Sequence, residues 1–380
     1  MAVSTVQTNN RLVKYSQEIA REYVRENLFS PYMGTGLDAI IRLKNELKSG
    51  GQDMNIPLVT SLKGTGVGAG TLVGNEEAID DYGMRLRVGW ARNAVVTKKS
   101  DQQKDSADIF GEAKPLLTDW GKERQRDDII NAFMSIPTET GPTSDDTTVN
   151  GILYESATAA QRNAFNAANS DRILFGNGTA NYNATHATAL ANIDTTNDRF
   201  TKTNLKLLKR LAKNANPRIR PYKTKDGREY FVAFAGSFAF RDIQNDLETV
   251  NKDARSREAR GMDDNPLFQD GDLLYDGVII REIPEISQFT TSVWTTLLTA
   301  GNGSTRVEPV FFCGQSAVAF GWGQMPRPTE RKEDDYGFVK GVGVEMCYGV
   351  EKMFKLHPKS GSSLVQWGMA TGFFSAPSDA

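Results

Sequence analysis

The sequence contains few of the residues from which catalytic and metal centres are most often built. Only two of its 380 residues are cysteines and only two are histidines. Cys313 and Cys347 are too isolated for a disulfide framework or a zinc site, so we interpret both as buried, small apolar residues. His186 and His357 have no motif around them and are expected in surface loops. We therefore expect no catalytic residue, no metal site and no cofactor.

Long apolar runs and an excess of one charge are also missing. No stretch approaches the roughly 18 apolar residues that a membrane-spanning helix needs, and the polar residues 1–11 lack the apolar core of a secretory signal. With 39% apolar and 24% charged residues and a net charge of −2, the composition is typical of a folded protein, not a disordered one. These features predict synthesis and function in a cytoplasm, with no membrane partner.

The pattern of apolar residues in the first quarter of the chain predicts a helix followed by a long hairpin. Helical spacing at residues 12, 15, 19 and 23 indicates a helix ending near Pro31. Alternating apolar residues then predict one strand from Met54 to Leu62 and another from Met84 to Trp90. Pro57 favours an edge strand. Because an isolated two-stranded ribbon is marginal in water, this hairpin is expected to need a partner surface.

The glycine-spaced tract between these strands, Gly64–Gly70, can be aligned with the G-x-G-x-x-A pattern of dinucleotide-binding loops. That pattern requires a helix to begin at the loop, so that its N-terminus can hold the pyrophosphate. Here Gly74 and a second strand follow instead. The tract is therefore interpreted as a flexible hairpin tip.

Downstream, the apolar period predicts a mixture of helices and strands without a βαβ repeat. A long helix is expected over about residues 113–134, with Pro115 either in its first turn or at a kink. Residues 137–200 are rich in Ser, Thr, Asn and Gly, which predicts loops with short elements in a surface insertion. Further helices are expected at 203–215 and 238–250, and strands at 230–235, 277–283, 307–313 and 317–322. Two closing strands, Val342–Val350 and Val365–Phe373, are predicted to pair.

Charge is most uneven in residues 201–230, where ten Lys and Arg residues face only two acidic residues, giving a net charge of +8. On the predicted helix, four lysines share one face: Lys202, Lys206, Lys209 and Lys213. This face could contact nucleic acid without sequence preference, meet an acidic neighbouring subunit, or be solvated. The acidic pairs Glu76–Glu77, Asp127–Asp128 and Asp334–Asp335 are interpreted as solvated or salt-bridged groups.

Several segments, in this order, resemble the Hong Kong 97 (HK97)-type major capsid proteins of tailed bacteriophages, specifically the group named after phage N-four. The segments that carry the resemblance are Asn55–Val59, Leu62–Gly64, Gly74–Glu77, Asp171–Gly176, Asn216–Pro221, Asn265–Phe268, Tyr275–Val278 with Glu282, Gly314–Gly321 and Asp334–Gly337. They span most of the chain, and their shared order is more specific than any one of them.

The resemblance implies an α+β, HK97-like capsid fold. Its expected parts are an N-terminal arm (1–48), an extended loop (49–100), a peripheral domain with a long spine helix (101–136), an axial domain with the surface insertion (137–330), and closing strands that return to these domains (331–380). Relatives lay the extended loop across an adjacent subunit. The residues expected to make this contact are Lys63, Gly66, Gly68, Glu76 and Glu77. Some relatives cross-link lysine to asparagine between subunits, but the position of Lys63 gives no basis for assigning that chemistry here.

The function that the resemblance implies is structural and not enzymatic. Such proteins self-assemble as hexamers and pentamers into an icosahedral shell around double-stranded DNA, in the cytoplasm of a host bacterium, and remain in the virion. Expected partners are other copies of the chain, a portal, scaffolding or decoration proteins, and packaged DNA bound non-specifically. Because the arm begins near Met1, a separate scaffolding protein is expected. The alternatives are an encapsulin-type compartment on the same fold, an enzyme and a nucleic-acid-binding module.

Overall fold

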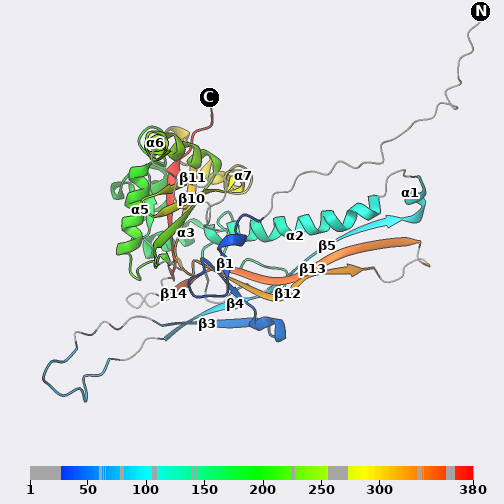
Figure 1. Ribbon diagram of the computed structural model, residues 1–380, viewed down its shortest axis with the longest axis horizontal. Helices are drawn as coiled ribbons and strands as arrows, with labels where there is room; N and C mark the ends of the chain where they lie inside the picture. Colours follow the sequence, from blue (N-terminus) through cyan, green and yellow to red (C-terminus); the bar gives the residue numbers. More distant parts are fainter. Residues whose placement is uncertain are drawn as a thin grey trace, which may run out of the picture.

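The structure is a computed structural model that describes residues 27–59, 62, 64, 66–77, 81–104, 109–138, 141–142, 144–223, 227–255, 273–331, 336, 338–356 and 364–379. The helix predicted over residues 12–23, Lys63, His357 and the pair Asp334–Asp335 lie outside the described residues. Figure 1 shows a globular part, an elongated part in which a long helix runs beside long strands, and a protruding hairpin. The mixture of helices and sheets confirms the predicted α+β class.

A seven-stranded sheet forms the centre of the globular part, in the order β6-β16-β11-β8-β10-β9 with β7 paired to β8. Its strands are β6 (Ile173–Phe175), β7 (Tyr222–Lys223), β8 (Glu229–Ala235), β9 (Leu273–Tyr275), β10 (Val278–Glu282), β11 (Val307–Cys313) and β16 (Met369–Ser375). Every residue of β11 and β16 is buried. Strands covered on both faces lose the alternation of polar and apolar residues, because neither face meets water.

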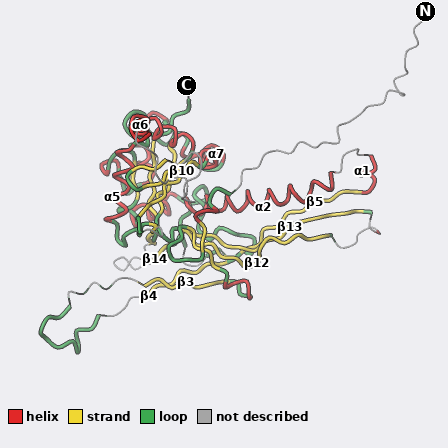
Figure 2. Tube along the Cα trace, viewed as in Figure 1, coloured by secondary structure: helices red, strands yellow, loops and turns green. Residues whose placement is uncertain are grey.

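Helices cover both faces of this sheet (Figure 2). One face packs against α5 (Lys202–Asn214) and α6 (Ser237–Arg255), with Leu208 and Ile243 in a shared core with Phe312 of β11. The other face packs against α7 (Pro284–Ser292) and the end of α2 (Ile109–Met134), where Phe133 stacks on Phe311 with ring centroids 5.2 Å apart.

The elongated part is built on a five-stranded sheet in the order β1-β2-β12-β13-β5. Its strands are β1 (Met33–Gly34), β2 (Ile41–Lys44), β5 (Gly89–Lys98), β12 (Val318–Glu330) and β13 (Val339–Lys352). The helix α1 (Lys99–Lys104) follows β5, and Ala113 and Leu117 of α2 pack against Val342 of β13. The predicted long helix is confirmed, but Pro115 lies inside α2, past its first turn.

The protruding hairpin consists of β3 (Asp53–Val59) and β4 (Asp81–Arg87), paired antiparallel as a separate two-stranded sheet. It confirms the two predicted strands and the position of Pro57 on an edge strand. The predicted second strand, however, divides at Val88: β4 pairs with β3, and β5 begins at Gly89 and pairs with β13. At this point the chain passes close against β13. A Cβ on Gly349 of β13 would overlap the carbonyl oxygen of Arg87.

Two predictions about tertiary arrangement are wrong. The closing strands do not pair with each other: β13 pairs with β12 and β5, whereas β16 pairs with β11 and β6. Residues 137–200 do form loops with short elements, but they are not a surface insertion. Their strand β6 is buried in the seven-stranded sheet, and Leu190 and Phe200 lie in the core. Because the segment is mostly polar, its composition did not indicate that these few apolar residues would be buried in the core.

The remaining elements are short. They are α3 (Ala159–Ala168), α4 (His186–Ala191), the paired strands β14 (Phe354–Leu356) and β15 (Leu364–Gln366), and the 3-10 turns η2 (Ser30–Tyr32), η3 (Glu46–Ser49), η4 (Thr179–Asn181), η5 (Thr295–Leu297) and η6 (Asn302–Ser304). Among the helices that the structure describes, none combines the length and apolar character needed to cross a bilayer.

Candidate assembly surfaces

The tip of the hairpin exposes large apolar side chains. Leu72 is 67% exposed and Val73 is 80% exposed, and both lie in the loop that projects beyond β3 and β4 (Figure 1). The predicted contact residues Gly66, Gly68, Glu76 and Glu77 are exposed in the same loop. An exposed pair of apolar side chains at the end of a projecting element is typical of a binding surface, because burial on a partner removes that area from water.

The two acidic residues of the tip shape the loop. A carboxylate oxygen of Glu77 accepts a hydrogen bond from the Gly64 backbone N–H at 2.5 Å, and one of Glu76 accepts from the Gly74 N–H at 2.7 Å. Gly74 has a φ of +85°, a left-handed conformation that strains other residues. These bonds hold Leu72 and Val73 on a compact turn. This apolar pair was not predicted, although it lies between the predicted glycine tract and the acidic residues.

The base of the hairpin packs on its own chain. Ile56, Met84 and Leu86 are buried in a cluster that includes Met353 and Phe354. The expectation that the whole ribbon requires a partner is therefore wrong for its base, because neighbouring strands of the same molecule cover it. The exposed part is the tip. The hairpin is thus an arm anchored at one end.

A second exposed apolar group lies at the far end of the five-stranded sheet. There β5 ends beside the start of β13, with Val339 paired to Lys98. Val96 and Phe338 are both exposed at this end, and Tyr336 is almost completely exposed. This group is a second candidate contact surface, remote from the tip along the chain.

The predicted basic helix is confirmed as α5, with Leu205, Leu208 and Ala212 buried on the face opposite the lysines. Its lysines differ in their surroundings. Nζ of Lys202 lies 3.4 Å from Asp246 and Nζ of Lys209 lies 3.1 Å from Asp276, so these two charges are neutralised within the molecule. Lys206 and Lys213 are exposed, with Nζ of Lys206 over the ring of Tyr275. The charge available to an external partner is therefore smaller than the sequence suggests.

His186 is not a surface histidine, contrary to the prediction. It begins α4 in a buried position, where its ring meets Phe175 and Phe373 edge to face. Its Nε2 lies 3.2 Å from the hydroxyl of Tyr154. Burial, with a smaller contribution from the nearby positive charge of Arg162, lowers the pKa of His186 to about 4. The imidazole is thus a neutral core residue at pH 7.

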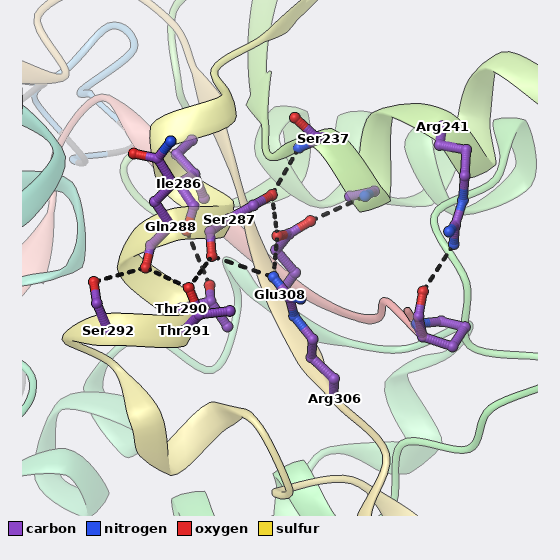
Figure 3. A network of polar contacts seen from close by, with 12 residues as sticks. Ser237, Arg241, Ile286, Ser287, Gln288, Thr290, Thr291, Ser292, Arg306 and Glu308 are labelled. Carbon is purple, nitrogen blue, oxygen red and sulfur yellow. Dashed lines mark hydrogen bonds and ion pairs between the residues drawn. The ribbon is translucent and has the colours of Figure 1, made fainter. Parts of the chain in front are cut away.

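One buried network of hydroxyl and carboxylate groups contains the kinds of side chain found in catalytic sites, but its hydrogen bonds join secondary-structure elements to one another (Figure 3). Glu308 accepts hydrogen bonds from the Ser287 hydroxyl at 2.5 Å and from the Ala239 backbone N–H at 2.9 Å. The Ser287 oxygen in turn accepts from the Ser237 N–H. Burial raises the pKa of Glu308, while these bonds and Arg306 oppose the rise. The network joins the starts of α6 and α7 to β11, and its serine is buried.

Other reactive groups are also enclosed. Cys313 and Cys347 are buried free thiols, which confirms their interpretation, and burial raises the pKa of each. Of the acidic pair Asp127–Asp128, Asp128 is buried and salt-bridged to Arg124 at 3.2 Å. Within the described part of the chain, no three His, Cys, Asp or Glu side chains are grouped as metal ligands.

Comparisons with known proteins show the family to which the chain belongs. The family model described as "Phage capsid protein" matches residues 4–369. This chain belongs to the phage capsid protein family. The solved capsid of cyanophage Pam1 is 37% identical to this capsid protein, with a TM-score of 0.85 and 100% of both chains covered. A search of curated proteins gave no match.

More distant capsids share the fold of this capsid protein. The capsid of Ralstonia phage GP4 is 19% identical, with a TM-score of 0.71 and 100% of both chains covered. The head structure of Helicobacter pylori bacteriophage KHP40 is 14% identical, with a TM-score of 0.62, covering 97% of this chain and 96% of that one. The predicted HK97-like capsid fold is confirmed. The encapsulin alternative is not favoured, since the family and these structures belong to phages.

Membership of this family makes the capsid protein a structural component of a virion that assembles with copies of itself. The buried networks described above agree with a structural role, since they hold secondary-structure elements together. The exposed groups at the hairpin tip, the far end of the five-stranded sheet and α5 are the candidate contact surfaces.

Proposed function

We propose that this capsid protein assembles as hexamers and pentamers into an icosahedral shell that encloses the double-stranded DNA of a tailed phage, in the cytoplasm of the host bacterium. The observation that carries the proposal is the hairpin tip, where Leu72 and Val73 are exposed at the end of an arm anchored only at its base. A monomer gains nothing from presenting these side chains to water. A neighbouring copy would cover them.

The division into parts follows the same proposal. Residues 1–48 would form an N-terminal arm, 49–100 the extended loop, 101–136 the spine helix of the peripheral domain and 137–330 the axial domain, with residues 331–380 returning to both. The fit is supported by α2 as one long helix beside the five-stranded sheet and by the seven-stranded sheet as a separate centre. The group named after phage N-four remains the predicted subgroup.

A closed shell does not require strong individual contacts. Each subunit meets several neighbours, and many modest interfaces sum to a stable assembly. The exposed tip and the exposed far end of the five-stranded sheet suit this arrangement, because each presents a small apolar area and not an extensive one. The predicted contact residues Gly66, Gly68, Glu76 and Glu77 would lie at or near the interface, and we retain Lys63 as a predicted member of the set.

Further partners are part of the proposal. A portal would occupy one vertex, scaffolding or decoration proteins could accompany assembly, and packaged DNA would be bound without sequence preference. For DNA, Lys206 and Lys213 are the suitable members of the α5 face, because they are exposed, whereas Lys202 and Lys209 are paired with aspartates. The proposal assigns the chain no catalytic activity.

Electron microscopy of the purified protein at high concentration tests the proposal. We expect uniform hollow shells with hexameric and pentameric units. Particles that remain monomeric under all assembly conditions, including addition of any scaffolding protein encoded with it, would contradict the proposal.

A further inference from the structure

A small cavity lies where the two large sheets meet, lined by residues of α2, α3, α4, β6, β13 and β16. Its volume is about 20 Å³, enough for one occupant of the size of a water molecule or a halide ion. Most of its wall is apolar and includes the rings of Phe133, Phe165 and Phe373. A charged group in such a wall therefore has few neighbours that can compensate its charge.

Lys352 is such a group. It lies at the end of β13, lines the cavity and is only 1% exposed. Its Nζ lies 4.8 Å from the centroid of the Phe165 ring, and no described residue accepts a hydrogen bond from it or forms an ion pair with it. A buried ammonium group is costly unless an acceptor or an opposite charge lies beside it. Lys352 therefore requires a partner that the surrounding side chains do not provide.

The two titratable groups that act electrostatically on Lys352 from outside the cavity wall, Glu351 and Cys313, do not supply a negative charge. Glu351 precedes Lys352 on the strand and so faces the opposite side of the sheet. Its carboxylate accepts a hydrogen bond from the Thr138 backbone N–H at 3.4 Å, and burial raises its pKa well above the ordinary value, which favours the neutral acid. Burial also raises the pKa of the Cys313 thiol, which keeps it uncharged.

The other polar groups of the cavity wall are neutral or positive. The Tyr154 hydroxyl and the His186 ring are engaged with each other, and burial keeps both uncharged at pH 7 by raising the pKa of Tyr154 to about 12 and lowering that of His186 to about 4. The guanidinium group of Arg162 lies 5.2 Å from the centroid of the Tyr154 ring and carries a permanent positive charge. The buried hydroxyl of Thr371 on β16 makes no hydrogen bond to another of the described residues. The wall thus offers two cations and a hydroxyl donor.

We propose that this cavity binds one small monovalent anion, of the size of chloride or bromide, held by the Lys352 ammonium group and the Thr371 hydroxyl beside Arg162. The anion compensates the buried charge and joins β13 of the five-stranded sheet to β16 of the seven-stranded sheet. Because the site lies within one subunit, it does not depend on shell formation.

Binding of the anion is coupled to the protonation of Lys352. Burial lowers the pKa of this amine to about 7. A bound anion favours the protonated form, so binding takes up a proton wherever the free site is deprotonated. The affinity for the anion should therefore rise as the pH falls through about 7.

Thermal melting of the unassembled subunit in different sodium salts of equal ionic strength tests the proposed site. Gluconate is too large for the cavity, whereas chloride and bromide fit. Replacing gluconate by either halide should raise the melting temperature by at least about 2 °C, and more below pH 7 than above it. Lys352→Met should abolish both the halide effect and its pH dependence. The matched control Lys48→Met removes an exposed lysine and should respond to halide as the unmodified subunit does.

Two results would overturn the anion site. One is a melting temperature of the unmodified subunit that is no higher in halide than in gluconate, which would leave water as the occupant. The other is a full halide response in Lys352→Met, which would place the effect elsewhere on the molecule. Should Lys352→Met not fold, Thr371→Val provides a second measurement. It should raise the chloride concentration that gives half of the effect by roughly fivefold or more, and an unchanged concentration would contradict the assignment.

Discussion

Nη1 of Arg126 lies 3.4 Å from Oε1 of Glu285, and the two side chains are only 8% and 6% exposed. This ion pair joins α2 of the elongated part to α7 of the globular part. Arg126 is also 2.9 Å from Asp127 and 3.7 Å from Glu123, so one guanidinium group serves three carboxylates. A buried charge is tolerated only where its partners remain in place. This pair therefore adds to the packing of Phe133 on Phe311 in fixing the relative position of the two parts.

Replacing Arg126 by methionine should destabilise the unassembled subunit by about 3–5 kcal/mol, because it removes a buried cation that lies 3.4 Å from the buried carboxylate of Glu285. Chemical denaturation of the subunit measures this change. The control is Lys122→Met, which removes a half-exposed lysine 3.8 Å from Asp119 on the same helix and should cost less than about 1 kcal/mol. The double variant Arg126→Met/Glu285→Met should recover part of the loss. Equal costs for Arg126→Met and Lys122→Met would contradict the role assigned to the buried pair.

The burial of His186 makes the free energy of unfolding of the subunit depend on pH. Its folded-state pKa of about 4 lies below its unfolded value of 6.5, so the folded protein binds fewer protons between these values. Stability is therefore lost as the pH falls from 6.5 to about 4, by roughly 3 kcal/mol at 1.36 kcal/mol per pKa unit. Thermal melting of the subunit across this range, compared with His186→Gln, measures the effect. The difference between the two proteins should change with pH in this window, and a constant difference would refute the assignment.

Gly349 and Gly121 provide a matched pair of glycine substitutions. A Cβ at Gly349 would overlap the carbonyl oxygen of Arg87, whereas a Cβ at Gly121 on α2 would meet nothing within 4 Å. We expect Gly349→Ala to destabilise the subunit by about 2 kcal/mol or more through overpacking. Gly121→Ala should stabilise it by roughly 0.5–1 kcal/mol, because alanine favours a helix over glycine. Denaturation midpoints of the two variants check both signs.

The sequence was most informative where one element carries its own pattern. In α5, Leu205, Leu208 and Ala212 repeat at helical spacing opposite the lysines, and the structure buries all three. The strands β3 and β4 follow from alternation in the same way. Such patterns are local, because one face of a helix or ribbon meets the rest of the molecule and the other does not.

Features that depend on distant segments could not be predicted from the sequence. His186 lies in a polar stretch, yet Tyr154 and Phe373, which are far from it in sequence, enclose it. Glu351 and Lys352 continue a strand in which charged side chains would ordinarily face solvent, but both are buried. The partners of β13 were assigned wrongly, since alternation indicates which face of a strand is buried and not which strand lies beside it. A groove beside Trp90 is likewise lined by residues from five separate parts of the chain.

The basic face of α5 gives a prediction about DNA. The variant Lys206→Gln/Lys213→Gln should weaken binding of double-stranded DNA and lower the slope of log K against log salt concentration by about 1.8, or 0.9 per phosphate contact. Lys202→Gln/Lys209→Gln should change the slope less, because those ammonium groups are paired with Asp246 and Asp276. Fluorescence anisotropy with a DNA duplex between 50 and 200 mM salt gives these slopes. Identical slopes for the two variants would argue against an α5 contact with DNA.

The central claim is that the hairpin tip binds another copy of the chain, and the concentration that a tip variant needs to assemble tests it most directly. Leu72→Asp/Val73→Asp should raise the concentration needed for shell formation at least tenfold in light scattering, since each apolar contact contributes about 1.5–3 kcal/mol and 1.4 kcal/mol corresponds to a factor of ten. Its melting temperature as a subunit should be unchanged, because both side chains are exposed. The control Leu274→Asp should assemble as the unmodified protein does. Normal assembly by the tip variant would contradict the account.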